Sequence, residues 1–301
     1  MSSQLPLLAV PNVSEGRDAA SVDAITAAFT ASGTARLLDV HADADHHRAV
    51  LSLEGRPGTL ASALAAGAQE AVRRIDVGAG REQAQVGQHP QVGAIDVVPV
   101  VYLREELRGA ACAEALLAAH LIGSEVGVPV LMYGELAQGR SRAQLRRGGV
   151  SGLAQRMRAG EVRADFGPPA PHARAGVTLV AARGPLVAFN LELAPPAGPS
   201  QACAIAAAIR EGGPDGLPGL RAIGVELRRG ERAVGQVSMN VERPYELALV
   251  EVLAAVRRHA AVQSAEIVGL VSRAALEGFP QELAIRGFDP ARQVIENALG
   301  L

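Results

Sequence analysis

The 301-residue sequence contains no lysine and no tryptophan. Its 29 Lys and Arg positions are therefore all arginine. Schiff-base chemistry with pyridoxal phosphate and the phosphate-binding P-loop both require a lysine, so these two kinds of site are excluded. Arginine instead suits a planar, bidentate grip on carboxylates or phosphates, although a GC-rich genome also accounts for its abundance.

Aromatic side chains are scarce, at 3% of the residues, and the net charge is only -2. Few aromatics argue against stacking platforms for single-stranded nucleic acid, and the balanced charge argues against duplex binding. Two cysteines, Cys112 and Cys203, lie far apart in alanine-rich helical stretches. Small buried thiols are favoured over a nucleophilic cysteine, which no nearby His or Asn signature supports.

Long apolar runs are also missing. No stretch of about 18 uncharged apolar residues occurs, so no membrane span is expected. The N-terminus lacks a basic segment followed by a long apolar core, which a signal peptide would have. We therefore expect a cytoplasmic protein that binds neither membranes nor nucleic acid. A homodimer stays open, because dimers are the commonest assembly of soluble proteins.

The chain repeats one order of elements. Each half reads strand, helix, two strands, helix, strand, and the first half then adds a helix, a strand and another helix. The order β-α-β-β-α-β is the ferredoxin-like motif. The sequence therefore predicts an α/β fold, an α+β sandwich of two ferredoxin-like subdomains with facing sheets, helices outside and a cleft between them. A Pro/Gly-rich stretch at 164–176 predicts the boundary, with subdomains at 1–170 and 176–301.

Helical spacing of apolar residues supports this order. In the first predicted helix, apolar side chains recur on one face, as they do in a second-half helix predicted from about 244 to 259. The residues that form these two faces are Val22, Ile25 and Phe29, and Tyr245, Leu249, Val252 and Val256.

The segment "DVHADADHHR", residues 39–48, joins two predicted strands and is dense in carboxylates and imidazoles. His and Asp at such short spacings can converge on a metal ion. The match to the metallohydrolase pattern His-x-His-x-Asp-His is incomplete, because Asp43 stands where the second histidine belongs. A solvated hairpin explains the same residues equally well, so the spacing leaves both interpretations open.

His89 lies on a stiff turn in "VGQHPQVGAIDVVP", just before a predicted buried strand. Pro90 restricts the chain beside it, and flanking glycines allow another backbone to approach closely. A lone histidine is usually structural, but this setting also suits a catalytic side chain. Further on, Arg183 precedes a strand in a Pro/Gly-rich region that is either a linker or a loop over a ligand, where it could hold an anion.

Many segments resemble the glutamate formiminotransferases (formimidoyltransferases), in order, from about residue 9 to residue 299. The resemblance implies two α/β subdomains and a cleft that binds tetrahydrofolate as co-substrate, with no metal. It also implies transfer of the formimino group from N-formiminoglutamate to N5 of that folate, in histidine degradation, without the cyclodeaminase domain of the animal enzymes. The matching segments are "AVPNVSEGRD", "DADHHRAVLSLEG", "GQHPQVGAIDVVP", "VLMYGE", "DFGP", "AARGPLVAFNLEL", "IGVEL", "QVSMNV", "EIVGLV" and "GFDPARQVIENAL".

The resemblance also implies roles for individual residues. His89 matches the catalytic histidine of the family and would act as general acid and base. Arg183 matches an arginine of a family motif and would hold a substrate carboxylate. The other residues assigned to substrate or folate binding are Asn12, Asp39, His41, Asp43, Arg48 and Asn190.

The sequence departs from the family pattern at three positions. Gln91 replaces an arginine of the Gly-x-His-Pro-Arg pattern, His47 replaces an asparagine, and His41 stands where animal members have an acidic residue. These departures bear on the substrate more than on the fold. Two other functions therefore stay open: a metal-dependent hydrolase of a formimino or amide bond, built on residues 41–47, and a folate-binding protein without catalytic activity.

Overall fold

The computed structural model describes residues 5–78, 91–230 and 232–301. The chain forms two compact units, Met1–Gly184 and Pro185–Leu301. Each has its own sheet and its own hydrophobic core. The mixed α/β architecture expected from the sequence is confirmed.

The first unit contains a seven-stranded sheet whose first strand is interrupted at Pro11. The strands lie in the order β3-β4-β1/β2-β5-β7-β6, and only the pairs of β7 with β5 and with β6 are parallel. The bounds are β1 Leu7–Ala9, β2 Asn12–Val13, β3 Ala35–Asp43, β4 Arg48–Gly55, β5 Ile95–Val101, β6 Val130–Met132 and β7 Thr178–Arg183.

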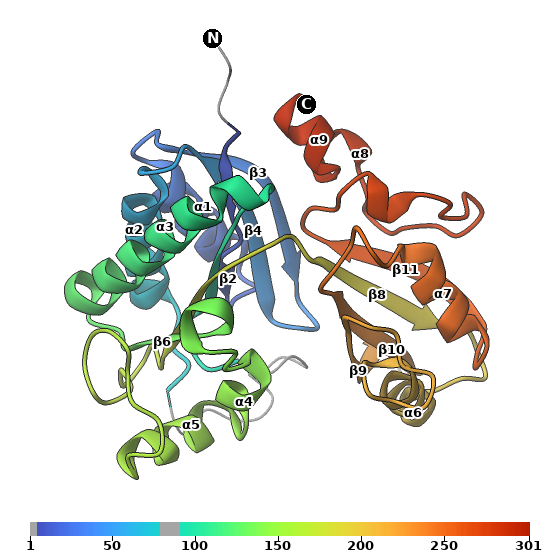
Figure 1. Cartoon of the computed structure of the whole chain (residues 1–301). Coiled ribbons are helices and arrows are strands. Elements are labelled where there is room, and N and C mark those ends of the chain that lie inside the picture. Colours follow the sequence, from blue (N-terminus) through green and yellow to red (C-terminus); the bar gives the residue numbers. More distant parts are fainter. Residues whose placement is uncertain (1–4, 79–90, 231) are drawn as a thin grey trace. The chain divides into compact units, whose positions relative to one another are not determined.

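Helices α1, α2 and α3 pack on one face of this sheet (Figure 1). Val22, Ile25 and Phe29 of α1 are buried, as their helical spacing predicted. Glu114 of α3 is buried and accepts a hydrogen bond from the backbone N–H of Ala61 at the start of α2, at 2.8 Å. A carboxylate there satisfies a donor that a helix leaves unpaired. The bounds are α1 Ala19–Thr30, α2 Leu60–Arg74 and α3 Arg108–Leu121.

The opposite face of β5, β7 and β6 carries a second apolar cluster, covered by two short helices, α4 Arg142–Arg146 and α5 Gly149–Arg158. The sequence predicted one helix over this stretch. It breaks because Gly148 has φ 80°, a left-handed conformation that ends a helix readily. Leu145, Leu153 and Met157 of these helices pack against the sheet.

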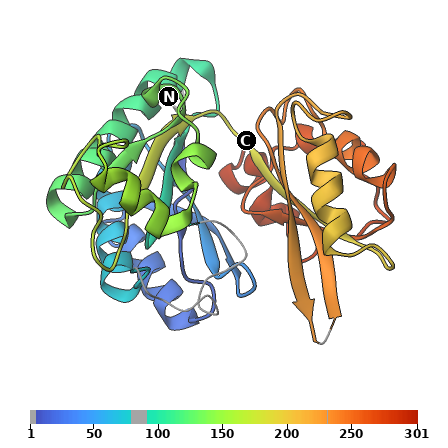
Figure 2. The same cartoon turned by 90° about the horizontal axis from the view of Figure 1, so that it is seen from below.

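The second unit has the predicted element order β-α-β-β-α-β in a four-stranded antiparallel sheet, β11-β8-β10-β9. Its apolar side packs against α6 and α7, and its β9–β10 hairpin is the long orange ribbon of Figure 2. The bounds are β8 Val187–Leu193, α6 Pro199–Ile209, β9 Leu220–Arg229, β10 Arg232–Val241, α7 Leu249–Arg257 and β11 Val262–Val268, followed by α8 Pro290–Gln293 and α9 Ile295–Leu299.

Three expectations differ from the structure. The predicted boundary between 170 and 176 lies before β7, yet β7 pairs with β5 and β6, so the first unit extends to Gly184. The helix predicted from about 244 begins only at Leu249, and Tyr245 is 58% exposed instead of lying on its buried face. Cys203 is exposed, whereas burial raises the pKa of the Cys112 thiol.

One helical stretch, Glu105–Val126, is long and apolar enough to cross a membrane by length and composition, and 39% of its apolar window is buried. Its inner face, which includes Ala111, Ala115, Ala118 and Ile122, packs into the core of the first unit. Core helices of globular proteins share these properties, so the stretch is weak evidence for a membrane span.

Candidate functional site on the first sheet

Polar side chains gather on the face of β2, β3 and β4 opposite α1 and α2. In β4, Ala49, Leu51 and Leu53 face the helices, so Arg48 and the other alternate residues face the opposite side. The register pairs Asp43 with Arg48. The structure therefore brings five of the predicted binding residues to one face of the sheet: Asn12, Asp39, His41, Asp43 and Arg48.

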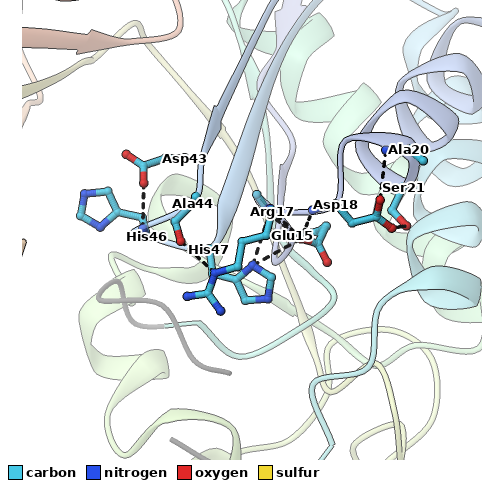
Figure 3. Close-up of polar contacts among 10 residues, drawn as sticks. Glu15, Arg17, Asp18, Ala20, Ser21, Asp43, Ala44, His46 and His47 are labelled. Carbon is cyan, nitrogen blue, oxygen red and sulfur yellow. Dashed lines mark hydrogen bonds and ion pairs between the residues drawn. The ribbon is translucent and has the colours of Figure 1, made fainter. Parts of the chain in front are cut away.

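The turn between β3 and β4 is held by its own polar groups and by Arg17 from the loop after β2 (Figure 3). Asp43 Oδ1 accepts a hydrogen bond from the backbone N–H of His46 at 2.8 Å. The carbonyl oxygen of Ala44 accepts one from Arg17 Nε at 2.9 Å. His47 has φ 46°, a left-handed conformation that is uncommon outside glycine. Asp43 therefore ends the strand and also stabilises the turn.

A loop after β2 lies beside this hairpin and contacts it (Figure 3). Glu15 Oε1 accepts hydrogen bonds from the backbone N–H groups of Gly16, Arg17 and Asp18 at 2.9, 2.8 and 3.0 Å. The same oxygen lies 3.4 Å from His47 Nδ1. A Cβ added to Gly16 would lie 2.2 Å from the carbonyl oxygen of Asp43, so only glycine allows the loop to approach so closely.

The histidines of the 39–48 segment thus divide between two environments. His41 lies on β3 among the polar residues of the sheet face, whereas His46 and His47 lie buried in the turn. The hydrogen bonds from the His46 N–H to Asp43 and from the Gly16 N–H to His47 Nδ1 account for the turn as a hairpin held by local polar contacts.

Asp96 lies at a β-bulge beside this face. Asn12 pairs with Val97 and Val13 pairs with Ile95, so Asp96 has no partner in β2. Its Oδ1 accepts a hydrogen bond from the backbone N–H of Val92 at 2.8 Å, and its Oδ2 contacts Arg146 of α4. The side chain of Asp96 is 2% exposed and that of Arg146 is 11% exposed, so this ion pair is largely shielded from solvent.

Arg48 begins β4, which β2 separates from β5, and it lies close enough to this ion pair for the charges of Arg146 and Asp96 to act on its guanidinium. Burial lowers its pKa to about 10, and repulsion from Arg146 and Arg142 acts in the same direction. Asp96 and Asp43 oppose this shift by attraction. Asp43 is also the register partner of Arg48, on the adjacent strand β3. The first sheet therefore carries a concentrated, incompletely neutralised positive charge next to Asp43.

His89 lies outside the described residues, and so its predicted catalytic role stays a prediction. The backbone that follows it is well anchored. The Ser14 hydroxyl donates a hydrogen bond to the Gly93 carbonyl at 2.7 Å, and a Cβ added to Gly93 would lie 2.1 Å from the Val177 carbonyl oxygen. The close approach expected of the flanking glycines occurs at Gly93.

Arg183 ends β7 and lies away from the Arg48 region. Its register partner is Val101, roughly 16 Å along β5 from Asp96 at ~3.3 Å per residue. Its Nη1 donates a hydrogen bond to the carbonyl oxygen of Gly184 at 2.9 Å. Within the first unit, the structure therefore does not bring Arg183 together with Arg48.

Asn190 belongs to the second unit, in the middle of β8. It is buried and its amide donates a hydrogen bond to Glu266 Oε2 on β11 at 2.8 Å. Glu192, two residues on, contacts both Arg229 and Arg286, at 3.4 and 3.0 Å. These carboxylates make the helix-free face of the second sheet strongly polar.

Several of these residues escaped the sequence analysis. Asp96 could have been recognised from the sequence, because it is the one charged residue inside the apolar run "AIDVVPVV". Arg142 and Arg146 carried none, because arginines are common on exposed faces of short polar helices. Only the packing of α4 against the sheet distinguishes them.

Comparison with known proteins agrees with this architecture. Residues 7–183 match the family model described as formiminotransferase domain, N-terminal subdomain. The chain is 31% identical over 300 residues to the glutamate formimidoyltransferase of Streptococcus pyogenes serotype M1, covering 96% of this chain and 97% of that protein. It is 32% identical to the glutamate formimidoyltransferase of Thermoplasma acidophilum, covering 93% of each.

A longer relative matches over part of its length. The chain is 34% identical over 284 residues to the formimidoyltransferase-cyclodeaminase of Rattus norvegicus, covering 89% of this chain and 50% of that protein. The family model spans the whole first sheet, including β7, and the two microbial relatives match at nearly full length. The chain therefore belongs to the formiminotransferase family.

Proposed function

We propose that this chain transfers the formimino group of N-formiminoglutamate to N5 of tetrahydrofolate, producing 5-formiminotetrahydrofolate and glutamate, as a step of histidine degradation. Its near full-length similarity to glutamate formimidoyltransferases carries this proposal. The polar face of the first sheet supports it, because the substrates are rich in carboxylates and this face combines arginine with other hydrogen-bonding side chains.

The reaction needs a carrier for two protons. N5 of the folate attacks the formimino carbon, a tetrahedral intermediate forms, and the bond from that carbon to the glutamate nitrogen breaks. A base accepts the N5 proton, and an acid protonates the leaving nitrogen. An imidazole with a pKa near ~6.5 can do both in turn, and His89 is assigned this role.

The position of His89 in the sequence supports that assignment. His89 comes three residues before Val92, so the covalent chain limits the separation of their Cα atoms to about 11 Å. Val92 is buried and its N–H is held by Asp96, next to Arg48. His89 thus precedes, by three residues in the sequence, a residue whose backbone is anchored beside this polar face.

The remaining assigned residues bind the two substrates. Asn12, Asp39, His41 and Asp43 offer hydrogen-bonding groups from the first sheet, and Asn190 offers an amide from the second. The arginines Arg48 and Arg183 offer the positive charge that carboxylates require. Small molecules are the expected partners of this chain, with tetrahydrofolate as co-substrate.

An assay of the purified protein with formiminoglutamate, with and without tetrahydrofolate, tests this function. Turnover that depends on folate supports formimino transfer. Turnover without folate would replace it by the hydrolase, and folate binding without turnover would replace it by a non-catalytic folate-binding protein, an alternative that Gln91 motivates.

Chelation separates transferase from hydrolase in a second way. The proposed mechanism uses no metal, and the turn is held by the hydrogen bond from the His46 N–H to Asp43 and by the one from the Gly16 N–H to His47 Nδ1. Prolonged dialysis against EDTA is expected to leave kcat unchanged. Loss of activity that zinc or manganese restores would instead assign residues 41–47 to a metal site.

Replacing Arg183 by alanine is expected to weaken binding of one substrate about tenfold or more. A charge-assisted hydrogen bond to a carboxylate is worth ~1.5–3 kcal/mol, and about 1.4 kcal/mol corresponds to a factor of ten. Steady-state KM values for both substrates check this, with the exposed Arg158→Ala as matched control. If neither KM changes in a folded Arg183→Ala protein, Arg183 does not bind substrate.

A further inference from the structure

Arg48, Arg142 and Arg146 are three arginines that act on one another beside two carboxylates, those of the buried Asp96 and of Asp43. Asp96 is already engaged on both oxygens, by the Val92 N–H and by Arg146. Arg142 lies with its guanidinium carbon 5.8 Å from the centre of the Tyr133 ring, close enough to Arg48 to lower the pKa of that group. Two carboxylates therefore face three cations, and the one that forms an ion pair, Asp96, is engaged by Arg146.

The same cluster contains polar atoms that nothing described satisfies. Nε of Arg146 and the hydroxyl oxygen of Tyr133 are buried and have no hydrogen-bond partner in the described part of the chain. Buried polar groups are nearly always hydrogen-bonded, and each exception needs an explanation. Unused donors beside an excess of positive charge indicate a site for an anion.

We propose that Arg48 and Arg142 form a carboxylate-binding subsite on the first sheet, with the Arg146–Asp96 ion pair behind it as a rigid support. A guanidinium presents two parallel N–H donors that match the two oxygens of a carboxylate. The inference rests on the proposed function, because it takes the carboxylate to come from the glutamate part of formiminoglutamate or from the glutamate tail of the folate.

When no anion is bound, the charge of Arg48 lowers the stability of the folded protein. The pKa of Arg48 is lowered to about 10, mainly by burial, so the fold disfavours its charged form at every pH below about 10. Arg48→Met keeps much of the side-chain length but removes the charge. In the absence of ligand this variant is expected to melt at or above the temperature of the native protein, as expected for a binding residue that costs stability.

Thermal melting in sodium glutamate tests binding without relying on activity. Glutamate is expected to raise the melting temperature of the native protein above that in sodium chloride of equal ionic strength. Arg48→Met and Arg142→Met should lose this increment. The control Arg56→Met alters an exposed arginine in the turn after β4 and should keep it.

Kinetics then identify which substrate supplies the carboxylate. Arg48→Met is expected to raise the KM of one substrate at least about tenfold, while the KM of the other stays within a factor of about two. A higher KM for formiminoglutamate shows that the bound carboxylate belongs to the formimino donor. A higher KM for tetrahydrofolate shows that it belongs to the glutamate tail of the folate. If the native protein shows no transfer but keeps the glutamate-dependent stabilisation, the proposed function fails and the subsite stands.

Two results would overturn the subsite. One is an unchanged glutamate-dependent stabilisation in both Arg48→Met and Arg142→Met. The other is a fall in the melting temperature of Arg48→Met in the absence of ligand together with unchanged KM values, because this combination assigns Arg48 a purely structural role. If Arg48→Met does not fold, Arg142→Met alone decides, since its side chain is half-buried on a surface helix.

Discussion

Replacing His89 by glutamine is expected to lower kcat by about 10²–10⁴-fold, while the Kd for folate stays within a few-fold. General acid–base catalysis contributes a factor of this size, and the lost interaction acts on the transition state more than on the bound substrate. Glutamine keeps much of the bulk and some of the hydrogen bonding of the imidazole, but it cannot accept a proton near neutral pH. Stopped-time assays of kcat and equilibrium binding of folate provide the two measurements.

The exposed His120 of α3 provides the matched control, because His120→Gln makes the same chemical change on the surface of the first unit. It should leave kcat unchanged. A folded His89→Gln protein that transfers the formimino group at close to the native rate would show that His89 is structural. His89→Ala, with its melting temperature measured beside the others, separates a catalytic loss from a loss of folding.

Replacing Asp96 by alanine is expected to reduce the free energy of unfolding by about 3–5 kcal/mol. The change leaves the nearly buried Arg146 without its partner and removes the acceptor of the Val92 N–H, and an uncompensated buried charge costs this much. For a unit of this size, the loss corresponds to a melting temperature lower by about 10 °C. Chemical denaturation and thermal melting both measure it.

The double variant Asp96→Ala with Arg146→Met tests whether the unpaired arginine causes this loss of stability. Because it removes the unpaired charge as well, it should recover most of the lost stability. A double variant as unstable as Asp96→Ala would show that the Val92 hydrogen bond, and not the ion pair, is the main stabilising contact. Equal stability of Asp96→Ala and the native protein would contradict the buried ion pair itself.

Local patterns predicted most of the helices and strands, because the periodicity of each depends only on residues that are close in sequence. Val22, Ile25 and Phe29 are buried on one face of α1 as their spacing required, and Arg48 begins β4 as expected. The apolar spacing did not predict where helix α7 begins. Tyr245 continued the apolar spacing of α7 toward the N-terminus, but the helix begins only at Leu249, so the side chain is left exposed.

Some predicted site residues lie together in the structure and others do not, and strand pairing decides which. Asn12 pairs with Val50, and His41 pairs with the same residue from the other side of β4. Since side chains alternate in strands, polar residues at such positions share a face once the pairing is set. Arg183 was close to a motif in sequence, yet its strand joins the sheet beyond β5, so it ends far from Arg48.

The sequence by itself determined the kinds of elements, their β-α-β-β-α-β order, the family and the exclusion of lysine-dependent chemistry, because all of these depend on residue identity and short spacing. Only the tertiary structure decided that β7 belongs to the first unit and that Arg146 meets Asp96 beside Arg48. The first depends on parallel pairing with β5, and the second on a bulge that directs Asp96 toward a helix far along the chain. Such long-range pairings follow from packing of the whole sheet, and no local pattern encodes them.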